Sequence, residues 1–212
     1  MNCPRCGGPV RPPDLMFSDW RCYGCGPVPP LHVPEHVGRE VMEATVSRIT
    51  GVPLWCPWPL PTGWLVTGVG WSGDERTGTE ATVLACSGPA PLCGGPGDVV
   101  LVAEKPGVGL GNRYAGLAGA DPGPYLQESL ANTAAHAKVK AAGWPTPLWA
   151  VESGGDRSAY VGEAKAMWLY AVTWPATAGY LFAEDMVLHD VTEWLPPELV
   201  YGAPSPYLRR AR

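Results

Sequence analysis

Four cysteines near the start of the chain are the residues most suited to chemistry. Cys3 and Cys6 form one C-x-x-C pair, Cys22 and Cys25 form a second, and 15 residues separate the pairs. Each pair can turn two thiolates toward one centre, and two pairs complete the tetrahedral sulfur coordination that zinc takes in proteins. We therefore predict one structural Zn²⁺ held by these four cysteines. Four protein ligands leave this zinc no open position for water or substrate.

Two disulfides and a redox-active C-x-x-C are the alternatives. The chain opens Met1-Asn2-Cys3, without the basic start and apolar run of a secretory signal, so we expect a cytoplasmic protein, in which disulfides are rare. His32 and His36 resemble the histidine half of a finger. However, only 6 residues separate Cys25 from His32, and Pro34 interrupts a helix there, so we assign both histidines to a linker.

A glycine-rich segment, residues 107–116, is the second motif that could bind a ligand. It fits neither register of the dinucleotide fingerprint, and the position of the Walker lysine holds Leu117. A simple turn is the main interpretation. The weaker one is an anion- or ligand-binding loop formed by Gly107, Gly109, Gly111 and Arg113.

No catalytic residue is predicted with any specificity. Cys86 lies where a strand meets a turn, and His136 or His189 could in principle activate it, but cysteine is commonly buried and inert. We expect Cys56 to be a packing residue and Cys93 a loop thiol.

The charge of the chain limits its partners. The net charge is −5, from 15 basic and 20 acidic residues, which disfavours a sequence-independent grip on nucleic acid. Residues 166–183 carry no charge and are long enough for a membrane helix. Trp174-Pro175 and Gly179 interrupt this stretch, so two strands fit better and we expect no membrane association.

The elements that must position these residues are short. Gly 27 and Pro 25 among 212 residues predict many turns, while 10 Trp argue for a packed core. We predict an α+β fold. Its parts are a zinc ribbon at residues 1–30, a Pro-rich linker at 31–36, and a mostly antiparallel domain at 37–212 with one or two helices.

Helices are predicted at residues 35–50, from their apolar period, and at 125–142, which end before Gly143. Strands are predicted at residues 64–71, 81–86, 98–104, 148–151, 158–163, 167–174, 179–183 and 186–191. The Pro-rich segment 53–61 is expected to lie extended against the core, with its tryptophans either buried or partly exposed as anchors for a partner.

Segments rich in Trp, Gly and Pro carry a resemblance to a known family: residues 57–64, 85–89, 107–116 and 145–149. Over nearly its whole length the chain resembles an uncharacterised actinobacterial family with a cysteine-rich start and one domain of unknown function. Some members are labelled phosphotransacetylase. That label implies a larger α/β enzyme that binds coenzyme A and acyl phosphate, whereas this chain has neither the length nor the parallel βαβ pattern.

These observations favour a non-enzymatic adaptor or regulatory protein that carries a zinc ribbon and binds a protein partner. The alternative is an enzyme or small-ligand sensor with a site near residues 107–116. A nucleic-acid-associated ribbon is the weaker alternative, because clustered Lys and Arg are missing.

Overall fold

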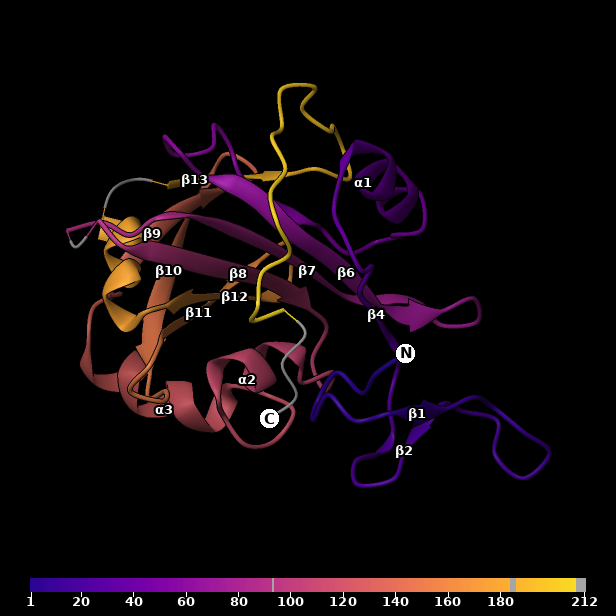
Figure 1. The fold of residues 1–212 in the computed structure, drawn as a ribbon. Helices are drawn as coiled ribbons and strands as arrows, with labels where there is room; N and C mark the ends of the chain where they lie inside the picture. Colours follow the sequence, from indigo (N-terminus) through magenta and orange to yellow (C-terminus); the bar gives the residue numbers. More distant parts are fainter. Residues whose placement is uncertain (93, 184–185, 209–212) are drawn as a thin grey trace.

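The computed structural model describes residues 1–92, 94–183 and 186–208. In this part of the chain, a small three-stranded sheet at the N-terminus sits beside a large curved sheet (Figure 1). The small sheet has the order β1-β2-β3, with β1 at Val10–Arg11, β2 at Arg21–Cys22 and β3 at Gly26–Pro27.

The large sheet has the order β4-β6-β7-β8-β12-β11-β10-β9-β13-β5. Its pairings are antiparallel except that of β13 with β9. Because β5 also lies against β7 and β8, the sheet curls back on itself. Its strands are β4 Leu31–His32, β5 Trp55–Pro57, β6 Leu65–Asp74, β7 Gly78–Pro89, β8 Pro96–Glu104, β9 Ala137–Ala141, β10 Trp144–Val151, β11 Ser158–Ala164, β12 Met167–Trp174 and β13 Met186–Asp190.

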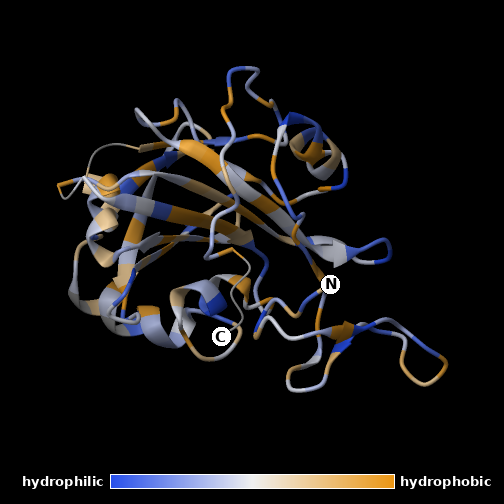
Figure 2. Cartoon of the chain, viewed as in Figure 1, coloured by the Kyte–Doolittle hydropathy of each residue, from blue (hydrophilic) through white to orange (hydrophobic). Residues whose placement is uncertain are grey.

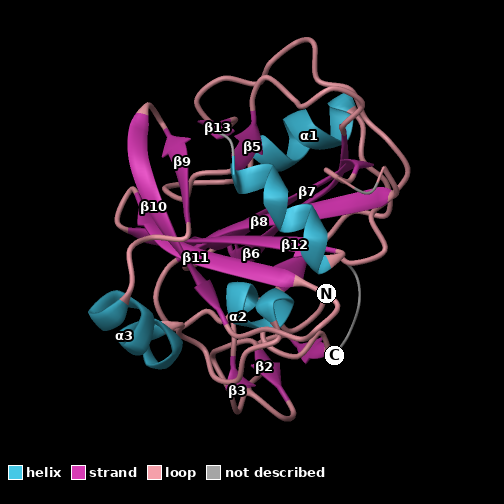
Figure 3. Ribbon diagram, turned by 90° about the vertical axis from the view of Figure 1, so that its left-hand side faces the viewer, coloured by secondary structure: helices cyan, strands magenta, loops and turns pink. Residues whose placement is uncertain are grey.

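Both faces of the sheet are covered. Alternating residues of β8 show this directly, because Leu101 belongs to one buried cluster while Val100 and Val102 belong to another. The first cluster lies inside the curl beneath α1 (Arg39–Val46). The second lies on the opposite face beneath α2 (Leu110–Ala115) and α3 (Gly123–Asn132), which Figure 3 shows on the far side of the sheet from α1.

The structure confirms the α+β class with a mostly antiparallel sheet and few helices. Seven of the eight predicted strands overlap observed ones. The prediction of a strand at 179–183 was wrong, because Ala176–Ala183 form a 3₁₀ helix, η1. The helix predicted at 125–142 was too long: α3 ends at Asn132, and β9 follows as the first strand of a hairpin that turns at Ala142 and Gly143, both with positive φ.

The expected linker at 31–36 is not a free spacer. Leu31 and His32 pair with Ser72 and Trp71 as the edge strand β4 of the large sheet. Leu31 also exchanges two backbone hydrogen bonds with Asn2, which directly precedes the first cysteine. Backbone pairing therefore joins the ribbon to the larger domain at Leu31.

Candidate metal centre

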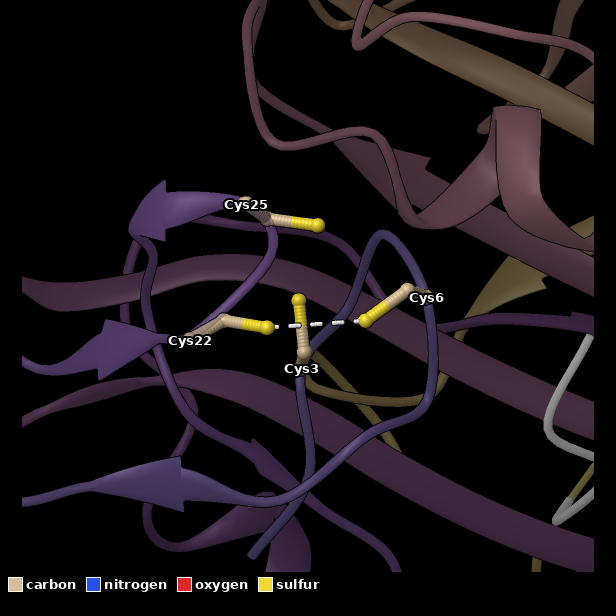
Figure 4. A group of neighbouring side chains, drawn as sticks. All are labelled: Cys3, Cys6, Cys22 and Cys25. Atoms are coloured by element: carbon tan, nitrogen blue, oxygen red, sulfur yellow. Dashed lines mark hydrogen bonds between the residues drawn. The ribbon is translucent and has the colours of Figure 1, made fainter.

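The four predicted cysteine ligands meet at one point. Their Sγ atoms all lie within 4.8 Å of one another, and Cys6 Sγ is 3.5 Å from Cys22 Sγ (Figure 4). A zinc ion with Zn–S bonds of about 2.3 Å needs sulfurs about 3.8 Å apart, so small side-chain movements would complete the tetrahedron. In the described part of the chain, this is the one group of three or more His, Cys, Asp or Glu side chains that could hold a metal ion.

Tight backbone turns aim the sulfurs inward. In the first pair, the Gly7 amide donates to the Cys3 carbonyl at 2.9 Å, and the Gly8 amide donates to Cys6 Sγ at 3.4 Å. Gly7 has a φ of +77°, which glycine adopts without steric cost. The second pair spans the β2–β3 turn, so the small sheet holds the two pairs face to face.

Backbone amides also lower the pKa of one thiol in the cluster. Burial raises the pKa of Cys22, but the backbone amides of Cys25 and Gly24 and the neighbouring thiols outweigh it and lower this pKa to about 7. Burial raises the pKa of Cys3, which lies deepest in the cluster. Metal ions bind thiolates and displace their protons, so this cluster of four cysteines could hold a metal ion.

His32 and His36 do not belong to this centre. His32 Nε2 lies 3.1 Å from the Gly73 carbonyl oxygen, and the ring stacks on Trp71 with centroids 4.2 Å apart. Burial lowers the pKa of His32, which favours its neutral form. His36 is exposed and lies outside the cysteine group.

In the glycine-rich loop, three backbone amides that could bind an anion already donate to side chains of the protein. The Gly107 amide donates to Asp121 Oδ1 at 2.7 Å, and the Leu110 and Gly111 amides donate to Glu104 Oε2 at 2.7 and 3.2 Å. Internal carboxyl groups therefore accept hydrogen bonds from these amides. Gly109 is the N-cap of α2, and Arg113 is buried on that helix with its guanidinium 5.2 Å from the Tyr114 ring.

Sequence reasoning missed a buried polar cluster around Glu104. This carboxyl group is fully buried, and burial raises its pKa to about 8 although amides and the nearby Tyr170 hydroxyl favour the charged form. Tyr170 donates to Asn112 Oδ1 at 2.8 Å, and the Asn112 amide donates to three loop carbonyls. A lone glutamate at the end of an apolar strand gives no sequence signal of burial.

Cys86 is placed as a packing residue. It is fully buried, and a contact with Cys56, together with burial, raises its pKa well above the usual value. Its candidate activators have other hydrogen-bond partners: His136 Nδ1 accepts from the Ala150 amide, and His189 Nε2 lies 3.0 Å from the Trp194 carbonyl. A protonated buried thiol is a poor nucleophile. Cys93 lies outside the described residues.

A cavity of about 990 Å³ opens between α1, β4, β6 and the N-terminal residues. The stacked His32 and Trp71 form one wall, Val41 of α1 and Arg48, just beyond the end of α1, form another, and Arg113 of α2 also lines it. This volume suits a small organic ligand. The sequence signalled Arg113 but could not place it opposite α1.

The hairpin loop between β1 and β2 exposes an apolar tip, formed by Leu15, Met16 and Phe17. Leu15 is fully exposed and Met16 is 81% exposed. Figure 2 shows this apolar stretch at the end of a hairpin that projects from the body of the protein. Asp14 holds the tip in a defined turn, because its Oδ1 accepts from the Met16 and Phe17 amides at 2.8 and 3.0 Å.

Comparison with protein families places the chain. Residues 1–208 match the family of unknown function DUF6758. The chain belongs to this family. The match carries no activity, so the expectations of an actinobacterial source and of a phosphotransacetylase label gain no support from it. No curated protein and no solved structure matches the chain significantly.

The described residues also bear on the membrane alternative for residues 166–183. They form β12 and η1. None of the helices in the described ranges combines the length and apolar character needed to cross a bilayer.

Proposed function

We propose that this protein is a non-enzymatic adaptor that binds a protein partner through the apolar tip of a zinc ribbon. The proposal places it in the cytoplasm, where reduced thiols remain available for zinc. One Zn²⁺ bound by Cys3, Cys6, Cys22 and Cys25 stabilises the ribbon. A segment of about 30 residues has too little core to fold without such a staple.

The observation that carries the proposal is the exposure of three consecutive apolar side chains on an ordered turn. Exposed Leu15 and Met16 cost solubility unless a partner covers them. Two contacts keep the loop in place: the Arg21 guanidinium lies 4.3 Å from the Phe17 ring, and Asp19 pairs with Arg76 of the β6–β7 turn. A preorganised apolar tip loses little conformational entropy on binding, which favours recognition by a groove on another protein.

Site-specific photocrosslinking tests the proposal. A photoreactive amino acid replaces Met16 in the full-length, zinc-loaded protein, and the control carries it at Trp144, which is 76% exposed at the start of β10. We expect one discrete crosslinked partner from extracts of the native host at position 16 and none at position 144. Leu15→Asp should abolish that product without lowering the melting temperature. Equal labelling at both positions would refute a specific tip.

The cavity favours a second candidate function, that of a small-ligand sensor. Its walls bring aromatic rings together with Arg48 and Arg113 at a volume suited to a metabolite. A thermal-shift screen against metabolites, repeated with Val41→Trp to fill the cavity, tests this candidate. A ligand that stabilises the native protein but not the filled variant would support the sensor, and a uniformly negative screen would count against it.

A further inference from the structure

One arginine of the metal ribbon reaches into the larger domain. Arg5 lies between Cys3 and Cys6 in the first C-x-x-C pair. Its Nη2 donates to the Gly107 carbonyl at 2.7 Å and its Nε to the Val108 carbonyl at 3.2 Å. Its Nη1 donates to the carbonyl of Cys25, in the second pair, at 3.3 Å. A single guanidinium therefore connects both cysteine pairs to the glycine-rich loop.

The glycines of the loop are suited to this contact. A Cβ atom on Gly109 would lie 3.0 Å from Arg5 Cγ and 3.0 Å from the Ala120 backbone, so a larger residue would push the arginine stem away. Gly107 has a φ of +87°, a conformation that glycine adopts readily and that accompanies the exposure of its carbonyl to Arg5. These glycines therefore leave room for the Arg5 side chain and expose a carbonyl to it.

The loop continues directly into α2 and the buried cluster. The Leu110 amide, at the start of α2, donates to the buried Glu104 carboxyl group. Arg113 of the same helix lines the cavity, as do Met1 and Asn2, which precede the first cysteine. The ribbon therefore lines the cavity through its N-terminal residues and, through Arg5, contacts the loop that leads into α2.

We propose that Arg5 couples the four-cysteine centre to the glycine-rich loop, so that zinc occupancy regulates the loop and α2. This inference rests on the proposed structural zinc. With the metal bound, the two cysteine pairs are fixed and hold the guanidinium against the carbonyls of Gly107 and Val108. Zinc loss unfolds the ribbon, withdraws these charge-assisted hydrogen bonds and frees the loop.

Hydrogen exchange measured by mass spectrometry tests the coupling in the full-length protein. The readout is the exchange of amides 107–113, compared with amides of the ribbon and of β12. Wild type is measured with zinc and after chelation. Arg5→Ala and Arg5→Lys are measured with zinc, and Arg11→Ala serves as the matched control because Arg11 is an exposed ribbon arginine on β1.

We expect chelation to speed exchange in the loop by about tenfold or more, as the loss of two charge-assisted hydrogen bonds implies, while β12 stays protected. Zinc-loaded Arg5→Ala should reproduce this loop exchange with its ribbon still protected. Arg5→Lys should be intermediate, because lysine keeps the charge but not the three-way geometry. Arg11→Ala should match wild type.

Two results would overturn the coupling alone: loop exchange in Arg5→Ala equal to that of Arg11→Ala, or a loop that stays protected after chelation while the ribbon exchanges. A separate metal analysis distinguishes failure of the metal centre. Wild-type protein that binds no zinc would refute both the structural zinc and its regulation of the loop.

Discussion

Replacing the buried Glu104 with glutamine should remove a large pH dependence of stability. Burial raises the pKa of this carboxyl group from 4.5 to about 8, so the folded protein keeps a proton that the unfolded chain has released across this range. The contribution of Glu104 to the free energy of unfolding is complete below pH 4.5 and is lost as the pH rises toward 8. The slope is about 1.4 kcal/mol per pH unit, or about 5 kcal/mol in total.

Glutamine preserves the contacts while removing the ionisation. Its Oε1 can accept from the Leu110 and Gly111 amides, as Glu104 Oε2 does. The variant should therefore fold, and the difference between its free energy of unfolding and that of wild type should shift in favour of the variant as the pH rises. Between pH 6 and 8 the difference should grow by about 2 kcal/mol, because the slope of about 1.4 kcal/mol per unit falls to half of that value as the pH reaches the folded pKa of about 8.

Urea unfolding at several pH values between 6 and 9, with zinc present, measures this difference. The window avoids acidic conditions, in which protonation of the cysteines would release the metal. Glu163→Gln is the control, because Glu163 is exposed on β11. Parallel plots of unfolding free energy against pH for wild type and Glu104→Gln would refute the reasoning. They would mean that Glu104 has the same pKa in the folded and the unfolded protein.

The remaining predictions concern the metal and the core. Purified wild-type protein should contain one equivalent of zinc by elemental analysis. The Cys22→Ser variant should contain none, and its ribbon should be cleaved faster by proteases. Gly111→Ala should lower the free energy of unfolding by about 1–3 kcal/mol or more, because the new Cβ would lie 2.2 Å from the Tyr170 ring. Trp55→Ala should lower the free energy of unfolding by about 3–5 kcal/mol, since Trp55 is buried. Trp58→Ala should lower it less, because Trp58 is partly exposed, and chemical denaturation measures both changes.

The sequence was most informative where structure depends on near neighbours. Two C-x-x-C pairs predict a cysteine cluster that could hold a metal ion, because the backbone turn alone brings each pair of sulfurs together. Strand β8 was predictable because its apolar run is bounded by turns. Strand β9 also has a strand pattern, because exposed Lys138 and Lys140 alternate with buried Val139 and Ala141. The helix that we expected over these residues hid this alternation.

What the sequence could not show depends on contacts between distant segments. Arg5 and Gly107 are 102 residues apart, and neither residue type predicts the other. The glycine-rich loop suggested an anion site because two different roles produce the same glycine-rich sequence. Glycines can make room for an arginine side chain, and glycines can also bind an anion. Only the positions of the carboxylates of Glu104 and Asp121, which take the loop amides, distinguish the two. The glycines of this loop are thus explained by a partner within the chain, Arg5 of the cysteine ribbon.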